Sequence, residues 1–112
     1  MPAIEELSVI IPIFNEEANI LNLYDRLKKV LDSITSNYEL IFVNDGSKDK
    51  SITLIKELAQ KDSTIKFIDF SRNFGHQIAV TAGLDRSVRK AVVIIDADLQ
   101  DLRNSLQKGT QK

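Results

Sequence analysis

The sequence predicts an α/β fold built on a parallel sheet, in the order strand–helix–strand–helix–strand–helix–strand. Four short apolar segments alternate with longer stretches in which apolar residues mostly recur at helical spacing. Helical crossovers between successive strands make those strands parallel, with right-handed connections. Polar side chains follow each apolar segment, and open sheets of this kind bind ligands beyond the carboxyl ends of their strands. We therefore expect the functional residues to meet at one edge of the sheet.

The composition is that of a single small globular domain. The chain has 112 residues, of which 43% are hydrophobic and 28% are charged. A net charge of −1 gives no electrostatic case for nucleic acid, and the absence of cysteine excludes disulfides and thiolate chemistry. No apolar run approaches the roughly 20 residues of a membrane span, and no signal-peptide pattern is visible at Met1 to Glu6. We expect a cytoplasmic chain without a membrane span.

The first strand is predicted at Leu7–Ile13, whose nearly continuous apolar run is typical of a strand covered on both faces. Pro12 cannot donate to a ladder and is expected to mark the end of this strand. Asn15 is then expected to cap a helix that has Glu16 and Glu17 in its first turn, where carboxylates suit the helix dipole. Helical spacing predicts about five amphipathic turns. The apolar positions are Ile20, Leu23, Tyr24, Leu27, Val30, Leu31 and Ile34.

The second strand is predicted at Tyr38–Val43, ending on a turn of sequence Asn44-Asp45-Gly46-Ser47. Either Ser51 or Asp49 can cap the helix that follows. The apolar positions of this helix are Ile52, Ile55, Leu58 and Ala59.

The third strand is predicted at Ile65–Phe70, and its partial alternation places it nearer an edge of the sheet. A polar loop from Ser71 to His76 follows it. A short helix is then expected, with apolar positions at Ile78, Ala79, Ala82 and Leu84.

The fourth strand, Ala91–Ile95, is predicted to be fully buried and to end on Asp96-Ala97-Asp98-Leu99-Gln100-Asp101. Asp96 and Asp98 lie two residues apart, so their oxygens can converge on a hard divalent cation that also binds a substrate diphosphate. An Asp-rich turn is the alternative interpretation. Beyond this segment, residues 102–112 show no periodic face and are expected to be a frayed tail after a domain of residues 1–101.

Several side chains at the other strand ends are candidate ligand contacts. The sequence has no glycine-rich phosphate loop, so a metal is expected to neutralise any bound phosphates. Asp45 can accept the ring N–H of uracil or guanine, or it can be an ordinary turn residue. Glu16 can hold a ribose or base, or simply favour the helix dipole. Arg72 can meet a phosphate or be a solvated surface charge. His76 is assigned no role.

Four segments together resemble the family-2 glycosyltransferases, most of all the subgroup similar to dolichyl-phosphate mannosyltransferase and the bacterial polyprenyl-phosphate glucosyltransferases. The resemblance runs from about Leu7 to Asp101 and implies a Rossmann-like parallel sheet, the N-terminal half of a GT-A domain. The segments are Val9 to Glu17, Val43 to Ser47, Ser71 to His76 and Asp96 to Asp101.

The resemblance also implies roles for individual residues. The nucleoside pocket would be lined by Pro12, Phe14, Glu16 and Asp45, with Val43 beside it as a further nucleotide-sugar-binding residue. A catalytic DXD-type site would be formed by Asp96, Ala97, Asp98 and Gln100, with Asp98 and Gln100 foremost, and Asp96 beside them, as ligands of Mg²⁺ or Mn²⁺.

The implied activity is inverting, metal-dependent transfer of a hexose from a UDP- or GDP-sugar to a polyprenyl (dolichyl or undecaprenyl) phosphate. Full-length relatives are expected at the cytoplasmic face of a membrane. After Asp101 the sequence departs from the pattern of the subgroup. The alternative expectation is therefore a truncated, non-catalytic nucleotide-binding fragment.

Overall fold

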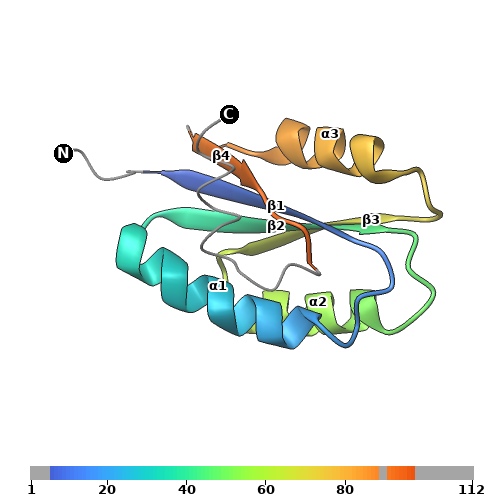
Figure 1. Ribbon diagram of the computed structural model, residues 1–112, viewed down its shortest axis with the longest axis horizontal. Coiled ribbons are helices and arrows are strands. Elements are labelled where there is room, and N and C mark those ends of the chain that lie inside the picture. The colour runs from blue at the N-terminus through green and yellow to red at the C-terminus, as the bar shows by residue number, and fades with distance from the viewer. Residues whose placement is uncertain (1–5, 89–90, 98–112) are drawn as a thin grey trace.

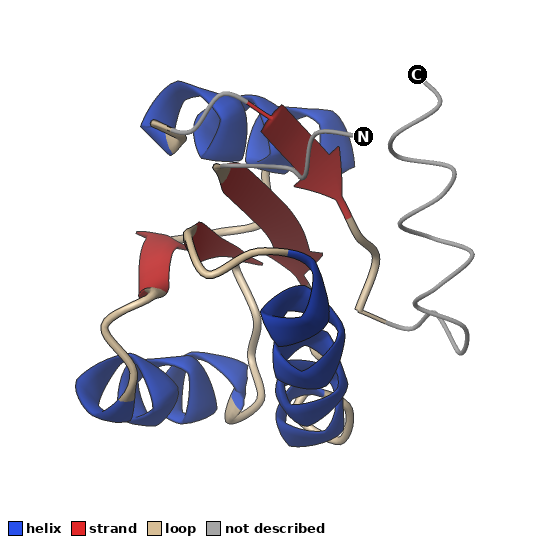
Figure 2. Cartoon of the chain, turned by 90° about the vertical axis from the view of Figure 1, so that its left-hand side faces the viewer, coloured by secondary structure: helices blue, strands red, loops and turns tan. Residues whose placement is uncertain are grey.

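The computed structural model describes residues 6–88 and 91–97 and shows three layers, with a central sheet between helices (Figure 1). The four strands are all parallel and lie in the order β3-β2-β1-β4. Helices α1 and α2 cover one face of the sheet and α3 covers the other (Figure 2). The predicted fold class is confirmed. In chain order the elements are β1 (Leu7–Ile13), α1 (Ile20–Ile34), β2 (Tyr38–Asp45), α2 (Ser51–Lys61), β3 (Ile65–Phe70), α3 (His76–Arg86) and β4 (Ala91–Ile94).

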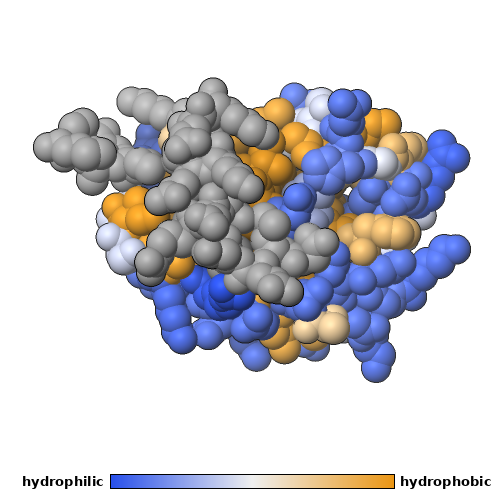
Figure 3. Space-filling view, viewed as in Figure 1, coloured by the Kyte–Doolittle hydropathy of each residue, from blue (hydrophilic) through white to orange (hydrophobic). Residues whose placement is uncertain are grey.

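The larger core lies between the sheet and the helices α1 and α2. Helix α1 contributes Ile20, Leu23, Leu27 and Leu31, and these side chains pack against alternate residues of the central strands. The outer surfaces of α1 and α2, in the lower part of Figure 3, are mainly hydrophilic, as amphipathic helices require. None of the helices in the described ranges is long and apolar enough to cross a membrane.

Helix α3 lies close to the other face of the sheet. It buries the small residues Ala79 and Gly83. A Cβ added at Gly83 would lie only 2.5 Å from Cγ2 of Ile10, so a glycine is required where α3 crosses β1. The smaller core on this side consists of Ile10, Ile41, Val43 and Ala79.

Glu39, on β2, is a buried charge at the amino ends of the strands, with only 1% of its surface exposed. Its carboxylate accepts hydrogen bonds from Lys66 Nζ (2.6 Å), Ser8 Oγ (2.5 Å) and the backbone N–H of Val88 (2.9 Å). Burial raises the pKa of Glu39, but these donors, Lys66 foremost, outweigh burial and leave the pKa below its ordinary value. The Glu39 carboxylate therefore links β1, β2 and β3 to the segment that follows α3.

Strand β1 has the predicted bounds, Leu7–Ile13, and Pro12 is its second-to-last residue. The carbonyl of Ile10 accepts a hydrogen bond from the backbone N–H of Ile95 (2.9 Å), on the side of β1 that faces β4. Pro12 is two residues further along the strand, so its backbone nitrogen points toward the same side. The last β1–β4 pair is Ile10 with Ile94, so Pro12 lies beyond it. The missing N–H of Pro12 consequently removes no ladder hydrogen bond.

Helix α1 begins at Ile20, so the predicted cap at Asn15 was wrong, and Glu16 and Glu17 lie in the loop before the helix. Asn15 has φ of 55°, the left-handed region, which a helix cap does not adopt. The helix has 15 residues, about four turns rather than five. The loop residues are instead held by the chain that follows β2.

Strand β2 runs two residues beyond its predicted end, through Asp45, because Asn44 and Asp45 still pair with β3. The N-cap of α2 is Lys50, so the predicted cap at Ser51 or Asp49 was wrong. Ser51 is the first residue of the helix, and Asp49 Oδ1 accepts its backbone N–H at 2.9 Å. The predicted edge position of β3 is confirmed.

Strand β4 is not fully buried, contrary to expectation. It pairs with β1 alone among the described strands, and Ile94 is 39% exposed. Ile95, directly after the strand, is fully buried on the α1 side.

Asp62, just after α2, joins α1 to the start of β3. It accepts hydrogen bonds from Tyr24 Oη (2.7 Å) and from the backbone and hydroxyl of Thr64 (2.9 and 2.7 Å), and it pairs with Lys28 (3.0 Å). Burial raises the pKa of Asp62, but these donors outweigh burial and hold it well below its usual range. Burial, together with the hydrogen bond to Asp62, raises the pKa of Tyr24 to about 12.

Replacing Asp62 with asparagine is expected to lower the free energy of unfolding at pH 7 by about 1–3 kcal/mol, the cost of losing charged hydrogen bonds. The folded pKa of Asp62 lies below its unfolded value of about 3.9, so its contribution is present above that pH and is lost as the pH falls. Urea unfolding should therefore show the gap between wild type and Asp62→Asn narrowing below about pH 4. The control is Asp25→Asn, at an exposed pair with Lys29. A gap that stays constant with pH would contradict this account.

Candidate functional site

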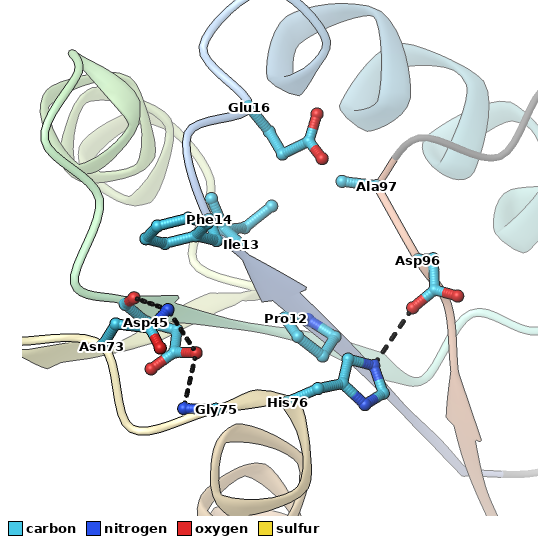
Figure 4. A pocket seen from close by; sticks show the side chains of 10 residues that line it. All are labelled: Pro12, Ile13, Phe14, Glu16, Asp45, Asn73, Gly75, His76, Asp96 and Ala97. Atoms are coloured by element: carbon cyan, nitrogen blue, oxygen red, sulfur yellow. Dashed lines mark hydrogen bonds and ion pairs between the residues drawn. The ribbon is translucent and has the colours of Figure 1, made fainter.

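A pocket opens at the carboxyl edge of the sheet, between the end of β2 and the ends of, or segments after, the other three strands (Figure 4). This is the edge at which the sequence placed the functional residues. The lining residues are Pro12, Ile13, Phe14, Glu16, Asp45, Asn73, Gly75, His76, Asp96 and Ala97.

Asp45, the last residue of β2, organises one wall of the pocket. It is only 4% exposed, and its carboxylate accepts the backbone N–H of Phe74 (2.7 Å) and of Gly75 (3.1 Å) and the side-chain amide of Asn73 (3.2 Å). These bonds fix the loop between β3 and α3. Asp45 is thus a strand residue that shapes a neighbouring loop, rather than a member of a local turn.

Gly46 brings the loop after β2 against the loop after β3. Its φ is +73°, and an added Cβ would overlap the backbone of Arg72 and Asn73. Both the backbone conformation and the space therefore require glycine here.

The loop after β3 also carries a stacked group outside the pocket lining. Phe74 packs edge-on against Phe70 with ring centroids 5.3 Å apart, and the Arg72 guanidinium lies 4.7 Å from the Phe74 ring centroid. Arg72 is therefore held on an aromatic face at the surface, and it does not line the pocket.

His76 and Asp96 face each other on the opposite wall (Figure 4). His76 Nε2 lies 3.2 Å from Asp96 Oδ1, and both side chains are more than half exposed. His76 had no predicted role. Its position in the sequence could have indicated a role, because His76 follows the loop after β3. In a parallel sheet the segments after β3 and β4 lie at the same carboxyl edge.

The pocket brings together most of the residues that the sequence singled out. Val43 does not line it, because it is fully buried beneath α3. Asp98 and Gln100 lie outside the described residues. The predicted residues that line the pocket are Pro12, Phe14, Glu16, Asp45, Asp96 and Ala97.

The described residues supply carboxylates to the pocket but no complete set of metal ligands. Residues 6–88 and 91–97 contain no cluster of three or more acidic or histidine side chains suited to a metal. They do supply carboxylate oxygens at Asp96 and Glu16, the donor type that Mg²⁺ and Mn²⁺ prefer. The donor chemistry fits a hard cation that shares its shell with ligand oxygens.

Comparison with protein-family models identifies the chain. The model described as Glycosyl transferase family 2 matches residues 8–112. The chain belongs to glycosyltransferase family 2. The match includes the last eleven residues, which the sequence analysis had set apart as a tail, and whose structure lies outside the described ranges.

Curated relatives align with this family-2 chain over 96 residues, 86% of its length. It is 56% identical to an uncharacterized glycosyltransferase, YkcC, of Bacillus subtilis. It is 40% identical to a bactoprenol glucosyl transferase of Shigella phage SfX and 38% identical to a prophage bactoprenol glucosyl transferase homolog of Escherichia coli. The chain spans only 30–32% of the length of these relatives.

Solved structures share the fold. A mannosyltransferase of Pyrobaculum calidifontis, PcManGT, in complex with GDP-Man and Mn²⁺, superposes with a TM-score of 0.76 over 95% of this chain and 32% of its own, at 21% identity. S. aureus TarS in complex with UDP superposes with a TM-score of 0.73 over 83% of this chain and 27% of its own, at 26% identity. Both likenesses support the GT-A type of fold.

Gly46→Ala is expected to destabilise the protein more than Gly75→Ala. Both glycines have positive φ, so both substitutions strain the backbone by about 1–3 kcal/mol. A Cβ at Gly75 would meet nothing within 4 Å, whereas at Gly46 it would overlap backbone. Urea unfolding of the two variants isolates the packing contribution. Equal losses of stability would show that the close approach of the two loops is unimportant.

Proposed function

We propose that this chain provides the nucleotide-sugar site of a glycosyltransferase that transfers a hexose from a UDP- or GDP-sugar to a polyprenyl phosphate. The observation that carries the proposal is the pocket, which unites a buried carboxylate, an exposed aromatic ring and a second carboxylate from different strand ends. Relatives named bactoprenol glucosyl transferase support the acceptor class.

The two ends of the pocket suit the two ends of a nucleotide sugar. Phe14 lies on the same side as Asp45 and Asn73, and its ring is 47% exposed, so it can stack on a base (Figure 4). Asp96 and His76 lie on the other side, where we place the diphosphate and the sugar.

We propose that Asp96, with Asp98 and Gln100 beyond the described residues, holds Mg²⁺ or Mn²⁺. When bound there, the metal would act as a Lewis acid for the departing diphosphate. The acceptor needs no protein base, since a phosphate monoester with a second pKa of about 6 is largely ionised at neutral pH. The catalytic roles of Asp96 and Asp98 belong to this proposal.

We propose uridine rather than guanosine as the base, and the contacts of Asp45 support this choice. A carboxylate has about four lone-pair positions, two on each oxygen. Oδ2 already accepts from Gly75 and Asn73, and Oδ1 accepts from Phe74, so one position remains, on Oδ1. Uracil offers a single ring N–H on its pairing edge. Guanine offers an N1–H and an adjacent amino group, and pairing with both needs two free oxygens.

In the presence of Mn²⁺, UDP is expected to bind at least about tenfold more tightly than GDP, because one hydrogen bond to a charged group is worth about 1.5–3 kcal/mol. Isothermal calorimetry measures both affinities. Omitting the metal should weaken the binding of both nucleotides, because their diphosphate oxygens would complete the coordination shell of the metal. Equal or tighter binding of GDP would reject the uridine assignment, and no binding of either nucleotide would reject the proposed function.

The alternative function, nucleotide binding without sugar transfer, is tested separately. The pocket residues account for donor contacts, while transfer also needs an acceptor held in line with the sugar, a positioning effect worth roughly 7–11 kcal/mol. We expect this 112-residue chain to bind UDP but to form no glycolipid from UDP-glucose, undecaprenyl phosphate and Mn²⁺. Product formation at the rate of a longer relative would exclude the alternative.

A further inference from the structure

Three successive backbone N–H groups in the loop after β1 are bound by side chains of the segment after β2. Each acceptor is a hydroxyl or a carboxylate, and all three lie within five residues of one another. The bonds run from Asn15 to Ser47 Oγ (2.9 Å), from Glu16 to Ser51 Oγ (3.0 Å) and from Glu17 to Asp49 Oδ2 (3.1 Å).

The segment after β2 is itself held rigidly. Ser51 is fully buried, and its own N–H is bound by Asp49 Oδ1 at 2.9 Å, so its hydroxyl has a fixed position at the start of α2. A return bond from the Lys48 N–H to Asn15 Oδ1 (2.8 Å) stabilises the left-handed conformation of Asn15. The two loops therefore form a closed set of bonds rather than a single contact.

These bonds act on one wall of the pocket. Phe14 and Glu16 line the pocket. Glu16 is itself one of the three bound residues, and Phe14 directly precedes the first of them, Asn15. Without the anchor, the loop of residues 14–19 would keep only its own bonds, from Asn19 and Ile20 to Glu16. Ordering a loop when the ligand binds costs free energy, so a wall that is fixed beforehand increases affinity.

We propose that Ser51, supported by Ser47 and Asp49, is a positioning residue for nucleotide binding. It acts through the Glu16 backbone, which it holds so that Phe14 and Glu16 face the pocket. This inference rests on the proposed function, because it concerns the same site.

A purely structural role for Ser51 is the competing explanation, and Ser8 provides a matched control. Ser8 is also fully buried, and its hydroxyl also makes a hydrogen bond, to Glu39 Oε2. It lies at the amino end of β1, at the opposite edge of the sheet from the pocket. Ser8→Ala and Ser51→Ala thus remove equivalent groups from the two edges.

The experiment measures UDP affinity by calorimetry in the full chain, with Mn²⁺ present, well below the unfolding temperature of every variant. Ser51→Ala is expected to weaken UDP binding about three- to tenfold, the effect of one hydrogen bond, while Ser8→Ala binds as wild type does. Amide hydrogen exchange should show faster exchange at Glu16 in Ser51→Ala and no change there in Ser8→Ala. If circular dichroism shows that Ser51→Ala does not fold, Ser47→Ala replaces it, with the same expectation at Asn15.

The outcomes separate this inference from the proposed function. Wild-type UDP affinity in the folded serine variant, or unchanged amide exchange in the loop, overturns the inference alone. Equal loss of affinity in Ser8→Ala assigns Ser51 a purely structural role and also overturns it. A wild-type chain that binds neither UDP nor GDP overturns the proposed function and this inference together. If the wild-type chain binds GDP alone, the same variants are compared with GDP.

Discussion

The seating of α3 on the sheet depends on two carboxylates of β2. Asp45 binds the backbone just before the helix, at Phe74 and Gly75, and Glu39 binds the backbone just after it, at Val88. The two acids are six residues apart on one strand, so they lie on the same face of the sheet. They therefore hold α3 at both of its ends. His76 is the first residue of this helix, and its contact with Asp96 follows from that placement.

The rim of the pocket is stabilised mainly by bonds between side chains and backbone, not by apolar packing. Side chains of β2 and of the segment after it bind the loops on both sides: Asp45 holds the loop after β3, and Ser51 holds the loop after β1. Each of these bonds pairs a backbone N–H of a loop with a side-chain acceptor. The loops are therefore fixed without large side chains that would fill the pocket. The segment after β2 is thus the common support of the site.

Apolar patterning was sufficient to predict the elements but not their polar ends. The bounds of β1 and β3 follow directly from their apolar runs. Asn15 was placed at a helix start because its local chemistry suits a cap, yet its tertiary bonds to Ser47 and Lys48 place it in a left-handed loop. Asp45 was placed in a turn for the same reason, although pairing with Phe70 keeps it in the strand. Such bonds join residues about 30 positions apart, which local sequence patterns do not encode.

Helix α3 buries only small side chains, and this has a consequence for the lifetime of the pocket. This helix buries Ala79 and Gly83, whereas α1 buries four larger apolar side chains. Segments with few buried apolar contacts open by local unfolding at a lower free energy than the core does. We therefore expect α3 to open by local unfolding at a lower free energy than α1. Each such opening frees the amides held by Asp45 and separates His76 from Asp96, so the assembled site persists only as long as α3 stays docked.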